Sequence, residues 1–258
     1  MNQWLTLLNK EILEMTRNFK WIWVPIVFIL IAVMEPITAY YMPQIIDSLG
    51  NLPDGAVIEL PMPSAEEVLV ASLSQYNTLG LLVIILSSMG IIAGERKTGV
   101  AGLILVKPVS YTAFVTAKWA GAMLLLWISY FIGYFVSWYY VGILFDTIPF
   151  IDFIQSFFIY GLWLSFVLTI TVFFNSFLKS PGAAGFLSFA AVIILIVISG
   201  TFSKWVEWSP AQLLSYASTF IMSGSNSSDV WSAIILSVFG IIMLLGGSIV
   251  IFRRRELA

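Results

Sequence analysis

The sequence predicts an all-α integral membrane protein with six transmembrane helices. Its 258 residues are 60% hydrophobic and only 10% charged, with a mean hydropathy of +0.97. This composition leaves too little polar surface to cover a soluble globule. Mostly apolar runs, each long enough to cross a hydrocarbon core of about 30 Å as a helix, lie at Trp21–Tyr40, Asn77–Ala93, Thr116–Val136, Phe157–Phe177, Ala183–Phe202 and Val230–Phe252.

The composition also excludes several kinds of chemistry. The chain has no Cys and no His, so it lacks the commonest ligands of zinc, haem and iron–sulfur clusters and the usual thiol and imidazole catalytic groups. We therefore expect no catalytic residue and no metal site. The sequence contains no Gly-x-x-x-x-Gly-Lys-Ser/Thr phosphate loop, so any ATP hydrolysis must come from another chain.

The distribution of charge predicts the orientation, because Lys and Arg near span ends are retained in the cytoplasm. Every Lys and Arg except Lys204 precedes the first span, follows the last one, falls in the loops after the second and fourth spans or, as Lys118 does, lies at the start of the third span. The other loops are acidic. We therefore predict a protein of a bacterial cytoplasmic membrane with both termini cytoplasmic. The net charge of -2 hides this separation and indicates no nucleic-acid partner.

Within this topology we predict one domain, residues 1–258. Residues 1–20 are an amphipathic interfacial helix, 21–252 the six-span bundle and 253–258 a basic cytoplasmic tail. The first helix is indicated by apolar residues at three- and four-residue intervals, namely Trp4, Leu5, Leu8, Ile12, Met15 and Phe19. It acts either as an anchor on the lipid surface or as a docking surface for a cytoplasmic partner.

Two outer loops carry signals of helix starts. Ser64 and Glu67 have the Ser-x-x-Glu spacing of a capping box, which predicts a short outer helix running toward the second span. Ser209 and Pro210 suit the cap and first position of another helix, before apolar residues at helical spacing from 213 to 221. We expect this second segment to re-enter the outer leaflet or to pack on the other spans.

The first cytoplasmic loop, "GERKTGVAGLILVKPVSYTAFVTAKW" from Gly94 to Trp119, is more elaborate than a connection requires. Gly94 and Gly99 loosen the helix that leaves the second span, and Pro108 disfavours helix at the residue before it. A short surface helix fits residues 98–106, and Ser110 or Thr112 caps the next helix. We predict a rigid, cationic elbow.

This pattern of residues resembles that of a known family. Glu95-Arg96, Gly99, "LILVKPVS" from Leu103 to Ser110, and Lys118 are similar to the signature of ABC type-2 transporter permeases. The resemblance extends over the whole topology. Val100 stands where the family usually has Thr, and Tyr111 replaces a basic residue expected near Ser110.

The resemblance implies a permease subunit of an ABC exporter. Such a subunit pairs with a second permease half, as a homodimer or heterodimer, and with two cytoplasmic ABC ATPase subunits that bind ATP and Mg; this chain itself holds no cofactor. The elbow would seat in the ATPase, with coupling residues Glu95, Arg96, Gly99, Leu103, Lys107, Pro108 and Lys118. Alternatively, the basic residues contact anionic lipid headgroups. Glu95 is either a solvated ion pair or a contact with the amphipathic helix or the ATPase.

Inside the spans, Glu35 is the one acidic residue. An ionised carboxylate there should face protein or water rather than lipid, so it either lies near the outer surface or lines the substrate path. In the third span, Ser129, Gly133 and Ser137 permit close helix contact.

The substrate we expect is hydrophobic or amphipathic, such as a peptide or a drug-like molecule, because the spans carry few groups that replace an ion's hydration. An ABC permease for ion export or metal-centre assembly is an alternative. So is an ion-coupled secondary transporter, although one internal carboxylate and no broken-helix pair give it little machinery. A membrane enzyme such as an intramembrane hydrolase would, without His or Cys, need a Ser-Lys or paired-Asp arrangement inside the spans, and their interior offers no Asp or Lys.

If the elbow seats in the ATPase, Leu103→Asp or Pro108→Gly should uncouple ATP hydrolysis from transport while leaving membrane insertion intact. The Asp would bury a charge in an apolar contact, and the Gly would remove the rigidity of the turn. The ratio of ATP hydrolysed to substrate moved, measured in the reconstituted complex, tests this. Normal transport by both variants, at normal complex yield, would rule the elbow out as the coupling site.

Overall fold

The structure is a computed structural model that describes the chain except residues 1–2, 49–61, 101, 103–108, 225–228 and 257–258. The part it describes contains helices and no strand. In chain order the elements are α1 (Gln3–Arg17), α2 (Lys20–Ser48), α3 (Ala65–Gln75), the π-helical turn η1 (Tyr76–Gly80), α4 (Leu81–Ser88), α5 (Ala93–Lys97), α7 (Tyr111–Leu144), α8 (Phe150–Phe177), α9 (Pro181–Thr201), the 3-10 helix η2 (Pro210–Gln212), α10 (Leu213–Ser223) and α11 (Val230–Glu256).

The six predicted spans are confirmed. Helices long and apolar enough to cross a membrane cover Lys20–Ile46, Ala65–Lys97, Tyr111–Leu144, Phe150–Phe177, Pro181–Thr201 and Val230–Arg254. Several are longer than predicted, because helix continues past the apolar core at one or both ends. The first continues through Pro36 and Pro43, although proline lacks the N–H of a regular helical bond and commonly ends or kinks a helix.

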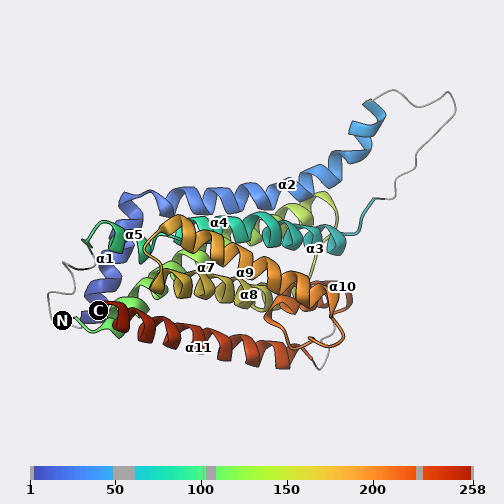
Figure 1. The fold of residues 1–258 in the computed structure, drawn as a ribbon. Helices are drawn as coiled ribbons and strands as arrows, with labels where there is room; N and C mark the ends of the chain where they lie inside the picture. The colour runs from blue at the N-terminus through green and yellow to red at the C-terminus, as the bar shows by residue number, and fades with distance from the viewer. Residues whose placement is uncertain (1–2, 49–61, 101, 103–108, 225–228, 257–258) are drawn as a thin grey trace.

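The spans lie side by side, and α1 runs across one end of the bundle, where α11 also ends (Figure 1). We call this the terminal end and the opposite one the distal end. The fourth span, α8, is the central helix, with 78% of its most apolar window buried, against 11% for the sixth. The outward faces of the first, fifth and sixth spans are therefore left for lipid or another chain.

Local capping signals are confirmed in atomic detail. At the start of α3, Glu67 N donates to Ser64 Oγ at 3.2 Å and Ser64 N donates to Glu67 Oε2 at 2.9 Å. The expected outer helix then continues through η1 into α4 and forms one long candidate span. Ser110 caps α7 by accepting from Ala113 N at 3.1 Å.

The segment before the last span is helical, as predicted. Ser209 Oγ accepts from Ala211 N, and Pro210 opens η2, which leads into α10. α10 buries Leu213, Ala217 and Phe220 and packs against α8 and α3. Packing on other helices is thus confirmed, whereas entry of this segment into the outer leaflet stays a prediction.

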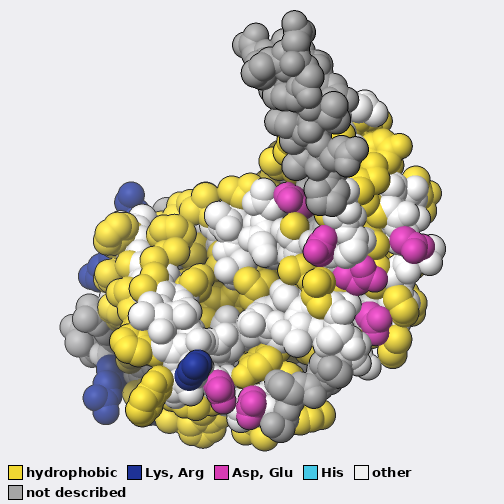
Figure 2. Space-filling model, turned by 90° about the vertical axis from the view of Figure 1, so that its right-hand side faces the viewer, with side chains coloured by type: hydrophobic (Ala, Val, Ile, Leu, Met, Phe, Trp, Pro, Cys, Tyr) yellow, Lys and Arg dark blue, Asp and Glu magenta, His cyan; other side chains and the backbone are white. Residues whose placement is uncertain are grey.

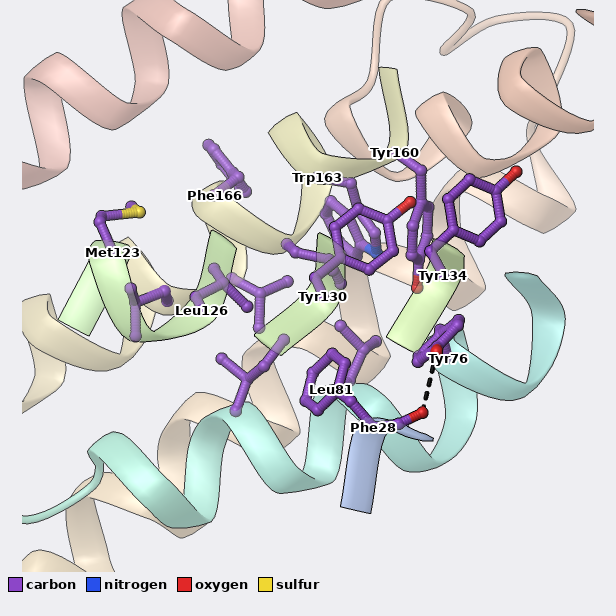
Figure 3. Close-up of a cluster of buried hydrophobic side chains, with 14 of the residues drawn as sticks. Phe28, Tyr76, Leu81, Met123, Leu126, Tyr130, Tyr134, Tyr160, Trp163 and Phe166 are labelled. Carbon is purple, nitrogen blue, oxygen red and sulfur yellow. Dashed lines mark hydrogen bonds between the residues drawn. The ribbon is translucent and has the colours of Figure 1, made fainter. Parts of the chain in front are cut away.

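Aromatic side chains fill the core between α3, η1, α7 and α8 (Figure 3). Tyr130 stacks on Tyr134 with ring centroids 5.5 Å apart and meets Tyr76 edge to face at 5.7 Å. The Tyr76 hydroxyl donates to the Phe28 carbonyl at 2.9 Å, which joins η1 to α2. Gly133 allows this approach, because a Cβ there would lie 2.9 Å from the same carbonyl. The small residues of the third span therefore serve packing within the chain.

The two ends of the bundle differ in charge. Exposed basic residues at the terminal end are Arg17, Lys97, Lys179, Arg253 and Arg254. Acidic side chains lie on elements of the distal end, namely Glu66, Glu67, Asp146, Asp152, Glu207 and Asp229, and Figure 2, which faces that end, shows acidic side chains spread over it. The separation seen in the sequence is therefore also a separation in space.

Candidate functional site

The amphipathic helix α1 packs on its own chain. A turn at Phe19, whose φ of 55° is unusual for a bulky residue, changes the direction of the chain between α1, which crosses the end of the bundle, and α2, which runs along it (Figure 1). Trp4 Nε1 donates to Thr116 Oγ1 on α7 at 3.1 Å. Gly121 on α7 lets α1 approach closely, because a Cβ there would lie 3.2 Å from the Cβ of Glu11. α1 thus has a defined seat on the base of the third span.

Five charged residues form an ion cluster in this seat: Lys10, Glu11, Glu14, Glu95 and Lys118. Lys118 Nζ lies 2.8 Å from a Glu11 oxygen and 2.9 Å from a Glu95 oxygen. Lys10 pairs with Glu11 at 3.1 Å, with Glu14 at 3.0 Å, and also with Glu95. The exposed fractions of Lys118, Glu11 and Glu95 are 1%, 4% and 7%, so the centre of the cluster is shielded from water.

The pairing shifts the pKa values of the outer members. Burial disfavours the charge of Lys10, but the hydrogen bond to Glu95 and the nearby negative charges outweigh it and raise the pKa of Lys10. Burial acts in the same way on Glu14, but the bond to Lys10 prevails and lowers the pKa of Glu14. Both groups are therefore held charged through the physiological range.

Three carboxylates of the cluster have oxygens within 4.8 Å of one another, those of Glu11, Glu14 and Glu95. Such a set also suits a cation, but Lys10 and Lys118 bind these oxygens here. One Glu95 oxygen, Oε2, has no hydrogen-bond partner within the described residues. The other oxygen of Glu95 and one oxygen each of Glu11 and Glu14 are paired with lysine, so these carboxylates form an ion cluster.

Arg96, next to Glu95, contacts two other helices. Its Nη1 donates to the carbonyl of Ser176, in the last turn of α8, at 3.0 Å. Its guanidinium lies 5.7 Å from the ring centroid of Phe252 on α11, within the range of a cation–π contact. The Glu95-Arg96 pair therefore connects the short helix α5 to α1 and α7 on one side and to α8 and α11 on the other.

The remaining residues of the predicted elbow are only partly described. Gly99 follows the end of α5 with φ of +78°, a left-handed conformation in which glycine commonly ends a helix. Leu103, Lys107 and Pro108 lie outside the described residues. Of the predicted coupling residues, the structure thus brings Glu95 and Lys118 together, turns Arg96 away from them, and leaves their role in coupling a prediction.

Lys10 and Glu11 were not among the predicted site residues. Glu11 lies three residues after Leu8 and four before Met15, so it interrupts the apolar side of α1. A carboxylate in that place is a signal for a buried partner. The contact of Glu95 with the amphipathic helix, one of two alternatives predicted for this residue, is confirmed.

Glu35 lies apart from the ion cluster, within α2. Its side chain is half-buried, and the described residues provide it with no hydrogen bond or ion pair. Met34 and Ile37 beside it are exposed, so the carboxylate lies near a face of α2 that the rest of the bundle leaves uncovered.

Replacing Lys118 with Met should destabilise the protein by about 3–5 kcal/mol, because it leaves buried carboxylates without their central cation. Thermal or denaturant unfolding of the purified protein measures the loss. Lys179→Met, at an exposed position, is the matched control and should change stability little. Adding Glu95→Gln to Lys118→Met should recover part of the loss. A loss no larger than that of the control would show that the cluster does not hold these helices together.

Comparison with known proteins agrees with this architecture. The model of a family described as "ABC-2 family transporter protein" matches residues 5–257. The chain is similar to the uncharacterized transmembrane protein YxlG of Bacillus subtilis (strain 168), with 35% identity over 256 residues and 99% of each chain covered. The chain is a multi-pass membrane protein, and it belongs to the ABC-2 family of transporter proteins.

Proposed function

We propose that the chain is the permease subunit of an ABC exporter, driven by separate ATPase subunits. Family membership supports the permease role and a partnership with ABC ATPases. The observation that carries the mechanism is the buried ion cluster, which joins α1, α5 and the base of α7 through Lys118 and Lys10. These elements flank the segment that connects the second and third spans.

The cluster supports coupling by displacement. A displacement of the segment after Glu95 would move α5, and the short charge-assisted hydrogen bonds of the cluster would transmit this movement to α1 and α7. Because Lys118 and Glu95 are buried, water does not compete for these bonds. They would act within the chain, and the exposed groups nearby, such as Lys97, would meet the partner. Glu95, Arg96, Gly99, Leu103, Lys107, Pro108 and Lys118 remain the proposed coupling residues.

We place the terminal end in the cytoplasm of a bacterial cell, with both termini there. The concentration of basic residues at that end supports this orientation. Two ATPase subunits and a second permease half, identical or related, would complete the transporter. The uncovered faces of the first and fifth spans support such a second half, and ATP and Mg would be bound by the partner.

The proposed substrate is hydrophobic or amphipathic, and Glu35 is proposed to border its path. The carboxylate lies in a span, with no partner in the described part of the chain, beside an uncovered face of α2. A charged group there requires water, substrate or another chain. Its sign favours substrates that carry positive charge.

The purified chain alone should hydrolyse no ATP, whereas the chain expressed with its cognate ATPase should copurify with it and support hydrolysis. The missing phosphate loop in this sequence is the reason. Phosphate release from both preparations tests it. Hydrolysis by the single chain, with contaminants excluded, would refute the proposal that a separate subunit hydrolyses the ATP.

Glu35→Gln should slow transport of cationic substrates more than that of neutral ones, because it keeps the size and hydrogen bonding of the side chain but removes its charge. Transport of matched cationic and neutral compounds in proteoliposomes measures the difference. Glu207→Gln, at an exposed distal position, is the control. If Glu35→Gln and Glu35→Ala both transport every compound at the unmodified rate, the path lies elsewhere.

A further inference from the structure

The second candidate span is interrupted just before it reaches the ion cluster. α4 ends at Ser88, α5 begins at Ala93, and the four residues Met89–Ile92 between them form a turn. In an unbroken helix Ile91 N would donate to the Ser87 carbonyl, but it donates to Ser88 O at 3.1 Å. The interruption lies inside the second candidate span, which runs from Ala65 to Lys97.

Side chains from two other helices satisfy the backbone groups that the turn releases. Lys20, the first residue of α2, donates to the freed Ser87 carbonyl at 2.7 Å. Asn175 on α8 accepts from Ala93 N through Oδ1 at 3.2 Å, and its Nδ2 lies 3.5 Å from Ser88 O. Backbone that leaves the helix at membrane depth needs such partners, so the interruption is built into the fold.

Asn175 is fully buried, and its Nδ2 also donates to the carbonyl of Thr171 on its own helix at 2.8 Å. That bond fixes the amide so that its oxygen faces Ala93. A small cavity lies beside the turn and is lined in part by Lys20, Ser87, Ser88 and Ile91. Its volume of about 20 Å³ is enough for about one water molecule. The turn therefore has a precise partner and some free space.

We propose that Met89–Ile92 is a hinge, held in this conformation by Lys20 and Asn175, about which α5 moves relative to α4 during the transport cycle. The proposal rests on the proposed function, because it assigns the movement to the action of an ATPase. When the hinge moves, α4 keeps its internal hydrogen bonds, and the contacts of Lys20 and Asn175 change together with the backbone bonds of the turn itself, Ile91 N to Ser88 O and Gly94 N to Gly90 O. The bond from Arg96 to the Ser176 carbonyl of α8 changes as α5 moves. α5 with Glu95 and Arg96 can then follow the partner without bending α4.

The chain's lack of Cys makes site-specific spin labelling direct. Labels at Leu82→Cys on α4 and Lys97→Cys on α5, both exposed, report on the two sides of the turn. The control pair, Leu124→Cys and Tyr139→Cys, has the same sequence separation on the uninterrupted helix α7. Distances are measured by pulsed dipolar spectroscopy in the complex with the ATPase, without nucleotide and with a non-hydrolysable ATP analogue and Mg.

The Leu82–Lys97 distance should shift with nucleotide by more than the rise of one helical residue, about 1.5 Å, while the control distance stays constant. Asn175→Leu or Lys20→Met should broaden the Leu82–Lys97 distribution without nucleotide. Thr171→Val is the matched control, because among the described residues this buried hydroxyl bonds only to Val167 O of its own helix. A distance that does not shift in a complex that hydrolyses ATP would overturn the hinge alone. Failure of the unlabelled chain to form any ATP-hydrolysing complex would overturn the proposed function and the hinge with it.

Discussion

The arrangement of the terminal end depends on one buried cation. Lys118 lies almost without exposure between Glu11 of α1 and Glu95 of α5, and moving a lone charge into such surroundings is prohibitive unless it is paired. Buried ion pairs contribute little net stability compared with apolar packing, but separating them is costly. The cluster therefore acts chiefly by specifying position: α1, α5 and α7 must keep one mutual arrangement to keep their charges compensated.

A second constraint comes from the bilayer, where the backbone has no water to bond. Helices meet this requirement internally. The serine and threonine hydroxyls of the central helix find their own partners by donating to a carbonyl about one turn back, as Ser165 does to Gly161 O at 2.9 Å and Thr169 to Ser165 O at 2.7 Å. Such hydroxyls put polar residues in α8 without leaving them unpaired. Where the second span does break, Lys20 and Asn175 take over the same task.

These two constraints divide the molecule into parts with different stiffness. The middle is a packed aromatic and aliphatic core in which Tyr76 of η1 meets Tyr130 of α7, and Tyr130 stacks on Tyr134. The terminal end is instead joined by a few directed polar bonds at Glu95, Arg96 and Lys118. Packed cores resist deformation, whereas directed bonds can exchange partners. A transport subunit needs both properties, a rigid core and an end that responds to its partner.

The sequence by itself determined the features that depend on neighbouring residues. Hydropathy predicted the spans, the Ser64 and Ser209 signals predicted helix starts, and the distribution of Lys and Arg predicted two ends of opposite charge. A helix start depends on one turn, a span on about 20 consecutive residues, and the end to which a charge belongs on the span beside it, so none of these requires a contact between distant residues. Only the tertiary structure decided which charges meet. Lys118 is 107 residues from Glu11, and Lys10 is 85 from Glu95, and no local pattern encodes a contact over such distances. The role of Asn175 likewise could not be predicted from the sequence, because its partner, the backbone N–H of Ala93, is freed by a break in another helix that lies beside α8 only in the folded chain.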